Sequence, residues 1–223
     1  MGNPVAVVVG AGRGLGAAIA RRFGQGGYDV ALIARTEATL AEIGEGLQGE
    51  GITTGWTAVD IIDEDALRAA IRRFGQHGGR IDVLHFNPSA MTAKGPLELS
   101  PAELLGDVHL GVASLLTAVQ AARPFMSEGA RITATGSATA DRPWAEAASL
   151  GVQKAALRNL VSAIDASLSA DGIRAASITV NGTITPGTRF DASLIADAVF
   201  EVSRLPGGAW RTEVAFNGRR SHS

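Results

Sequence analysis

The sequence predicts an α/β fold in which a mostly parallel, seven-stranded sheet carries helices on both faces in a doubly wound arrangement. Short runs rich in valine and isoleucine alternate with longer amphipathic segments along almost the whole chain of 223 residues, as is typical of β-α units around a buried sheet. The first apolar run leads through four glycines straight into a helical pattern. With 46% hydrophobic and 19% charged residues, the chain can bury the core of one domain, which we expect to span 1–223.

Each predicted element follows from its pattern. Strands are expected at the β-branched runs, over 4–9, 29–34, 54–59, 81–86, 130–135, 173–180 and 211–216. Helices are expected at the amphipathic segments between them, over 14–26, 36–49, 63–77, 100–127 and 149–170. Ser100 and Glu103 form a capping box around Pro101, and Asp63 stands at an N-cap position. Right-handed crossovers then place ligand binding at the carboxyl ends of the strands, and the tail 217–223 looks loose.

Composition narrows the class of ligand. A formal net charge of -2 and a pI near 6.1 give no electrostatic reason for binding nucleic acid or a membrane, so a small-molecule substrate is the default expectation. The sequence has no cysteine and four scattered histidines, which argues against disulfides, thiolate chemistry and a metal site. The start MGNPVA shows neither a signal peptide nor a myristoylation pattern, and we expect a cytoplasmic protein.

The segment VVVGAGRGLGAAIARRF joins the first strand to the first helix. Glycines let a backbone approach a pyrophosphate closely, and the helix N-terminus offers free N–H groups and the positive end of its dipole. A tight turn without a ligand is the alternative, but the position at the first β-α junction favours a Rossmann-like dinucleotide site. The expected contacts are Gly10, Gly12, Gly14, Leu15 and Gly16.

The residues after the second strand bear on the choice of dinucleotide. An acidic side chain there reads the ribose 2'-hydroxyl of NAD, but this sequence has Ala34 followed by Arg35. A guanidinium suits a 2'-phosphate, and Arg13 in the glycine loop could close on the same group. Each arginine could instead be a solvated loop residue. Together they favour NADP(H) over NAD(H).

Over nearly its full length the chain resembles the short-chain dehydrogenase/reductase family. Gly10, Gly14 and Gly16 fit the family's G-x-x-x-G-x-G spacing, although Val9 replaces its usual threonine. The family's Asn-Asn-Ala-Gly signature reads FNPS here, which retains only the asparagine at position 87, and Val180-Asn181 stands in place of Pro-Gly. The resemblance implies further cofactor contacts, near the adenine and the nicotinamide, from Asp60, Ile61, Asn87 and Thr185.

The catalytic set implied by the resemblance is incomplete. Ser137 and Lys154 fit the family's serine and lysine, but the tyrosine position, thirteen residues after the serine, is Leu150. The sequence has one tyrosine, Tyr28, just before the second strand, where it cannot substitute. His109 falls where the resemblance expects an asparagine.

The missing phenol bears on proton transfer. Leucine can neither protonate nor stabilise a developing alkoxide, and losing a general acid costs on the order of a hundred to ten-thousandfold in rate. By resemblance, Lys154 would still contact the nicotinamide ribose, while His109 is the candidate replacement acid and Ser137 could bind a substrate oxygen. The alternatives are a surface lysine, a histidine satisfied by its own helix, and a serine that caps a turn.

The sequence therefore leaves two candidate functions. One is an NADP(H)-dependent oxidoreductase of the short-chain type that acts on a small carbonyl, hydroxyl or activated double bond through an atypical site. The other is a catalytically degenerate NADP-binding protein that serves as a sensor or partner subunit. A scaffold without a nucleotide is hard to reconcile with the glycine loop, Arg35, Asp60 and Asn87. By resemblance, the helices near 107–127 and 149–170 would form a homodimer or homotetramer face.

Overall fold

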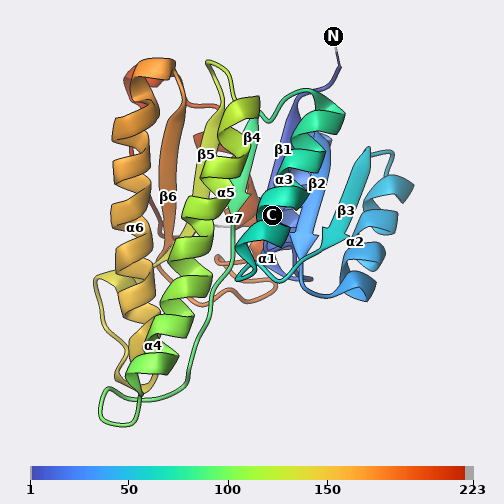
Figure 1. Ribbon diagram of the computed structural model, residues 1–223. Coiled ribbons are helices and arrows are strands. Elements are labelled where there is room, and N and C mark those ends of the chain that lie inside the picture. The colour runs from blue at the N-terminus through green and yellow to red at the C-terminus, as the bar shows by residue number, and fades with distance from the viewer. Residues whose placement is uncertain (1, 219–223) are drawn as a thin grey trace.

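A computed structural model describes residues 2–218, in which seven strands form one sheet in the order β3-β2-β1-β4-β5-β6-β7 (Figure 1). Every neighbouring pair is parallel. This confirms the predicted fold class. The strands are β1 (Val5–Val9), β2 (Asp29–Ala34), β3 (Thr54–Ala58), β4 (Val83–Phe86), β5 (Arg131–Ser137), β6 (Arg174–Val180) and β7 (Glu213–Phe216).

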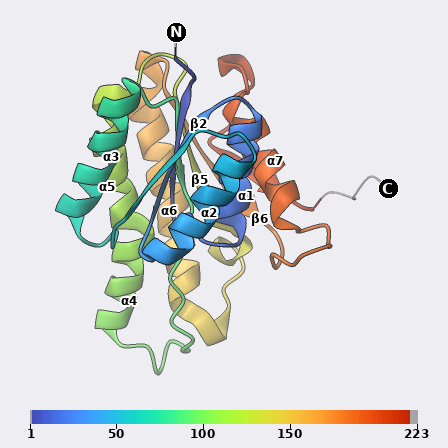
Figure 2. The same ribbon diagram turned by 90° about the vertical axis from the view of Figure 1, so that its right-hand side faces the viewer.

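Helices cover both faces of the sheet, as the crossover rule requires. In Figure 2, α3 and α5 lie on one side of the strands, and α1, α2 and α7 lie on the other. Helix α6 packs beside α5 (Figure 1). The helices are α1 (Leu15–Gln25), α2 (Glu37–Gly49), α3 (Glu64–Gly78), α4 (Pro101–Val108), α5 (Ser114–Ala122), α6 (Ala148–Leu168) and α7 (Ala192–Ser203).

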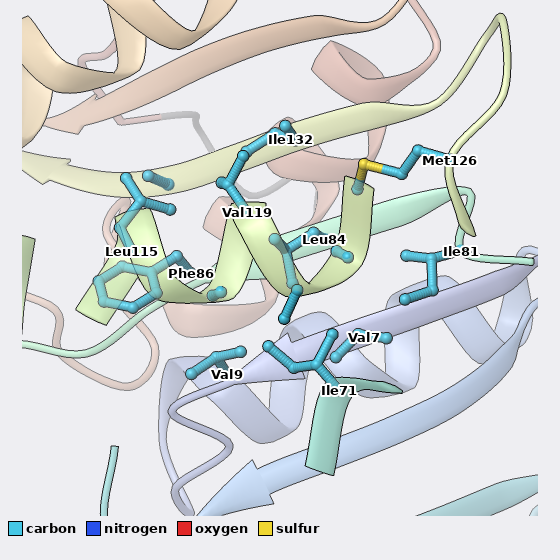
Figure 3. Packing of buried hydrophobic residues seen from close by; sticks show 14 of the residues in the cluster. Val7, Val9, Ile71, Ile81, Leu84, Phe86, Leu115, Val119, Met126 and Ile132 are labelled. Carbon is cyan, nitrogen blue, oxygen red and sulfur yellow. The ribbon is translucent and has the colours of Figure 1, made fainter. Parts of the chain in front are cut away.

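The core consists of two apolar layers separated by the sheet. Strand β1 is buried throughout, and its residues alternate between the layers because successive strand side chains point to opposite faces. Figure 3 shows Val7 and Val9 on the side that also receives Leu115 of α5 and Ile71 of α3. Ala6 and the other alternate residues of β1 join the second layer, beneath α1 and α7. Burial on both faces explains why the strand sequences are apolar almost without interruption.

Local signals place several helix ends where the sequence predicts them. Asp63 caps α3 by accepting from Ala66 N at 3.0 Å. Ser100 and Glu103 make both bonds of the capping box at the start of α4. The predicted single helix over 100–127 is instead interrupted by a π-helical turn, His109–Ala113, between α4 and α5.

Helix α7 is the element that the sequence analysis missed. Asp191 caps it by accepting from Ser193 N at 2.9 Å. Most of its residues are small or apolar and are buried against α1 and the sheet, so its sequence shows little contrast between a polar and an apolar side. Of the tail predicted to be loose, Asn217 and Gly218 follow β7 without regular structure, and 219–223 lie outside the described residues.

The long segment Pro101–Phe125 has the length and apolar composition of a membrane-crossing helix, a test that core helices also pass. Its α5 part is mostly buried against the sheet and α3. The carboxyl ends of β1, β2, β4, β5 and β6 meet at one edge of the sheet, where the loops that follow them form a cleft.

Candidate dinucleotide and active site

The glycine loop has a geometry that side chains would disrupt. Gly10 has a φ of +84°, and its N–H donates to Ile33 O at 2.8 Å. A Cβ on Gly16 would lie 2.4 Å from Gly10 O, so α1 can approach β1 this closely only with glycine there. No side chain caps the first turn of α1 at Gly14. The backbone N–H groups of this first turn of α1 are therefore suited to binding an anion.

A cavity of about 400 Å³ lies beside this loop, between the ends of β1, β2 and β4. Its wall includes the predicted contacts Gly10, Gly12, Arg35, Ile61 and Asn87. The hydroxyl-bearing residues Thr36 and Thr39 line it next to Arg35, whose side chain is exposed. This end of the cavity can receive a phosphate, because a guanidinium and two hydroxyls all donate hydrogen bonds.

The second predicted phosphate ligand, Arg13, is engaged elsewhere. Its guanidinium lies 2.7 Å from Glu42 of α2, and both side chains are exposed. The hydrogen bond and charge of Arg13 lower the pKa of the Glu42 carboxyl. The first acid after β2, Glu37, accepts from the Trp56 indole at 3.0 Å. Arg13 would have to leave Glu42 in order to reach a dinucleotide.

Two further predicted contacts lie at the margins of the cleft. Asp60 is exposed, and its Oδ1 accepts weakly from Ile62 N at 3.4 Å. Thr185 is exposed, and its hydroxyl bonds its own loop at Thr183 O, 3.4 Å away. Its neighbours Gly182 and Ile184, rather than Thr185 itself, line the adjoining cavity.

This second cavity, of about 290 Å³, shares Asn87 and Ser89 with the first. Its wall also includes Leu15, the first residue of α1, together with Ser137, Leu150 and Lys154. The structure thus brings the retained serine and lysine together at the end of β5 and the start of α6. Leu150 lines the same cavity.

Lys154 is a buried cation, with only 3% of its surface exposed. Its Nζ donates to Thr135 O at 3.0 Å and to Pro88 O at 3.3 Å. Burial lowers its pKa to about 8. An ammonium has three N–H groups, so one remains for a group that enters the cavity.

Ser137 is held by the turn that follows β5. Its Oγ accepts from Thr139 N at 3.3 Å and from the Thr139 hydroxyl at 3.1 Å. Since both acceptor positions are taken, the serine proton is free to be donated to a substrate oxygen. Tyr28 is absent from the walls of both cavities and packs edge-on against Phe23, with ring centroids 5.2 Å apart.

His109 is the residue that the resemblance offers as a replacement acid. The residue begins the π-helical turn, and its carbonyl accepts from the Ser114 hydroxyl at 3.1 Å. Among the residues described, Leu110 lines the first cavity, whereas His109 lines neither. The use of His109 as an acid through one water stays a prediction.

Polar residues that the sequence analysis did not consider also support the cleft. Gln153, just before Lys154, is fully buried and donates to Asp107 O at 2.7 Å and to Ala90 O at 3.4 Å. A Cβ on Gly111 would lie 2.2 Å from the Gln153 amide carbon, so this glycine makes room for the glutamine. Ser89 donates to Gln153 Oε1 at 3.4 Å. A polar residue within a predicted apolar segment is the signal that could have found such groups.

The parallel sheet, the glycine turn and the buried lysine define a dinucleotide-binding α/β protein. The chain belongs to the short-chain dehydrogenase family, whose model it matches over residues 4–193. It is 28% identical over 208 residues to an uncharacterized oxidoreductase of Staphylococcus epidermidis, a match that covers 87% of this chain and 88% of the relative.

Solved structures agree with this assignment. A short-chain dehydrogenase from Burkholderia cenocepacia in complex with NADP superposes with a TM-score of 0.88, at 26% identity over 96% of both chains. A blue fluorescent protein from a metagenomic library in complex with NADPH has a TM-score of 0.87, at 26% identity over 97% of both chains. The chain is an oxidoreductase of the short-chain type, and these relatives point to NAD(P) as its dinucleotide.

Proposed function

We propose that the protein is an NADP(H)-dependent oxidoreductase that reduces a small carbonyl compound or an activated double bond, or oxidises the matching alcohol, at a site without a phenol. The observation that carries the proposal is the buried Lys154, which shares one cavity wall with Ser137 next to the glycine-loop cavity. Burying an ammonium is costly, and a side chain that bears this cost at a cleft is a candidate functional group.

The residues present fit a phosphorylated dinucleotide. The glycine loop leaves room for a pyrophosphate at the uncapped end of α1, where N–H groups can bind it. Arg35, with Thr36 and Thr39, would hold the 2'-phosphate, and Arg13 would join after leaving Glu42. When bound, the nicotinamide would supply or accept the hydride.

Proton supply falls to the remaining polar groups of the second cavity. Ser137 can donate a hydrogen bond to a substrate oxygen, but a hydroxyl is a weak acid. Lys154, with a pKa of about 8, is the strongest acid that lines the cavity, and we propose that it serves as the proton reservoir. His109 could contribute only through water.

The apolar wall at Leu150 favours a particular kind of substrate. Hydride addition to an enone places negative charge on a delocalised enolate, which depends less on a strong acid beside the oxygen than an alkoxide does. Enones and quinones are therefore the preferred candidates, ahead of simple ketones.

The second candidate function is a catalytically degenerate NADP-binding sensor or partner subunit. The presence of Leu150, which has no ionisable atom, where the family has its acid supports this alternative. It requires the same dinucleotide site but no turnover.

One experiment separates the two functions. NADPH absorbance is followed with a panel of aldehydes, ketones, quinones and enones for the parent and for Leu150→Tyr. Turnover by the parent with an enone or quinone, lost in Lys154→Met, supports the oxidoreductase. NADPH binding by calorimetry without any turnover, together with new activity in Leu150→Tyr, supports the sensor. Absence of both heat and thermal protection with NADP(H) and NAD(H) would remove both proposals.

We also propose a homodimer or homotetramer in the cytoplasm, assembled through α4, α5 and α6. Leu105 is 67% exposed, Leu116 42% and Val152 49% on these helices. A shallow apolar groove runs between α5 and α6, and burying such a surface would favour association. Light scattering of the parent against Leu116→Glu tests this, and a parent that is monomeric at micromolar concentration would contradict it.

A further inference from the structure

His85 is an ionisable residue in the centre of the sheet that the proposed reaction does not use. It lies in β4 between Leu84 and Phe86 and is completely buried. Its ring contacts two threonines of the adjacent strand β5: Nδ1 lies 2.8 Å from Thr133 Oγ1, and Nε2 lies 3.2 Å from Thr135 Oγ1.

The proton positions in this network follow from its far end. Asn87 Nδ2 donates to Gly10 O at 3.1 Å, and a carbonyl can only accept. This bond fixes the orientation of the amide and leaves Oδ1 to accept from Thr135 Oγ1, 2.8 Å away. The only hydroxyl proton of Thr135 is used in this bond, so Thr135 Oγ1 must accept from His85 Nε2–H. Nδ1 is consequently bare and accepts from Thr133.

The environment holds the ring in this neutral form. Burial, and after it the charge of Lys154, lower the pKa of His85 to about 3. Protonation of Nδ1 would also remove the acceptor of the Thr133 hydroxyl proton. The imidazole is therefore neutral near neutral pH and donates from Nε2 to Thr135.

The network ends at the dinucleotide site. Thr135 lines the second cavity and also receives Lys154 Nζ on its carbonyl at 3.0 Å. Asn87 lines both cavities, and its backbone N–H donates to Val9 O at 2.9 Å. His85 is thus joined by directed hydrogen bonds to the ends of β1, β4 and β5 and to the first glycine of the loop.

We propose that His85 is a positioning residue of the dinucleotide site: its Nε2–H orients Thr135, and through it Asn87 holds the Gly10 carbonyl and the cavity wall in the geometry that binds NADP(H). The inference rests on the proposed function, because it requires that this site bind a dinucleotide.

Three substitutions of His85 separate the effect of losing the Nε2–H donor from the effect of changing the packing of the core. The side-chain nitrogen of His85→Gln can occupy the place of Nε2 and restore the bond to Thr135. The amide of His85→Asn reaches only the place of Nδ1, and His85→Leu restores neither. All three should lower the melting temperature, because they change a packed core.

The readout is the dissociation constant for NADPH by calorimetry on the full chain, at a temperature where each variant is folded. We expect a weakening of about five- to a hundredfold in His85→Asn and His85→Leu, the range for a buried polar group left unpaired, and less than threefold in His85→Gln. Equal weakening of NADPH binding in all three variants, or no weakening in His85→Asn and His85→Leu, would overturn the proposal. A parent that binds neither NADPH nor NADH instead refutes the proposed function.

Thr135→Val tests the same bond without touching the histidine and covers the case in which a His85 variant does not fold. It should weaken NADPH binding as His85→Asn does, and the double variant should be no weaker than either single one. Imidazole ¹⁵N shifts of the parent supply an independent check. They should report the Nε2–H tautomer unchanged between pH 5.5 and 9, and an Nδ1–H tautomer would contradict the network.

Discussion

Replacing Arg35 with alanine should remove the preference of the site for NADPH over NADH. Arg35 is exposed, lines the first cavity, and makes no ion pair with any of residues 2–218. A hydrogen bond to a charged group contributes about 1.5–3 kcal/mol, equivalent to roughly 12- to 150-fold in affinity. Because Arg35 is open to solvent, we expect the lower end, about tenfold weaker NADPH binding with NADH unchanged.

Arg13 supplies the matched control. Its charge is already shared with Glu42 across an exposed pair, and such pairs contribute little to stability. Arg13→Ala should therefore weaken NADPH binding less than Arg35→Ala does, while Glu42→Gln should tighten it by releasing Arg13. Calorimetry at about 50 mM and 500 mM salt gives the comparison, since screening should shrink all three effects. Equal losses for NADPH and NADH in Arg35→Ala would refute the assignment of the 2'-phosphate.

Further outcomes can be measured directly. Leu150→Tyr should raise ketone reduction by about a hundred to ten-thousandfold in the NADPH absorbance assay, and an unchanged rate would contradict the assigned position. The pKa of Lys154 in the folded protein, about 8, lies below its ordinary value, so between these two pH values the unfolded chain binds more protons than the folded one. The free energy of unfolding should therefore rise with pH over this interval, by up to about 3 kcal/mol. Lys154→Met should abolish that rise in urea titrations. Gly16→Ala, whose Cβ would meet Gly10 O, should cost about 1–3 kcal/mol, whereas Gly46→Ala, with open space in α2, should be neutral or stabilising by up to about 1 kcal/mol in the same titrations.

The fold could be predicted because its signals are local. Strands buried on both faces show as uninterrupted apolar runs, and the glycine turn shows as a spacing. Helix α7 lacked such a signal because it is apolar on most sides. The π-helical turn that interrupts the 100–127 helix contains Gly111, which lies against the side chain of Gln153 from another helix. Both depend on tertiary contacts.

The residues of the candidate site also differ in whether the sequence could predict them. Ser137 and Lys154 could be placed by resemblance, from the family's spacing, and both line the second cavity. The π-helical turn that begins at His109 could not be predicted, because the sequence of this segment has the pattern of one continuous helix. The bonds from His85 to Thr133 and Thr135 join neighbouring strands, and their register becomes visible only when the strands are paired.

The burial of Lys154 also affects which molecules remain in the cleft. Its bonding partners are two neutral carbonyls, and its pKa reflects burial alone, with no carboxylate of residues 2–218 balancing the charge. In a poorly screened environment such a cation attracts small anions strongly. Carboxylates such as acetate should therefore compete with uncharged substrates for this cavity, and inhibition by simple organic acids should fade once the pH exceeds 8.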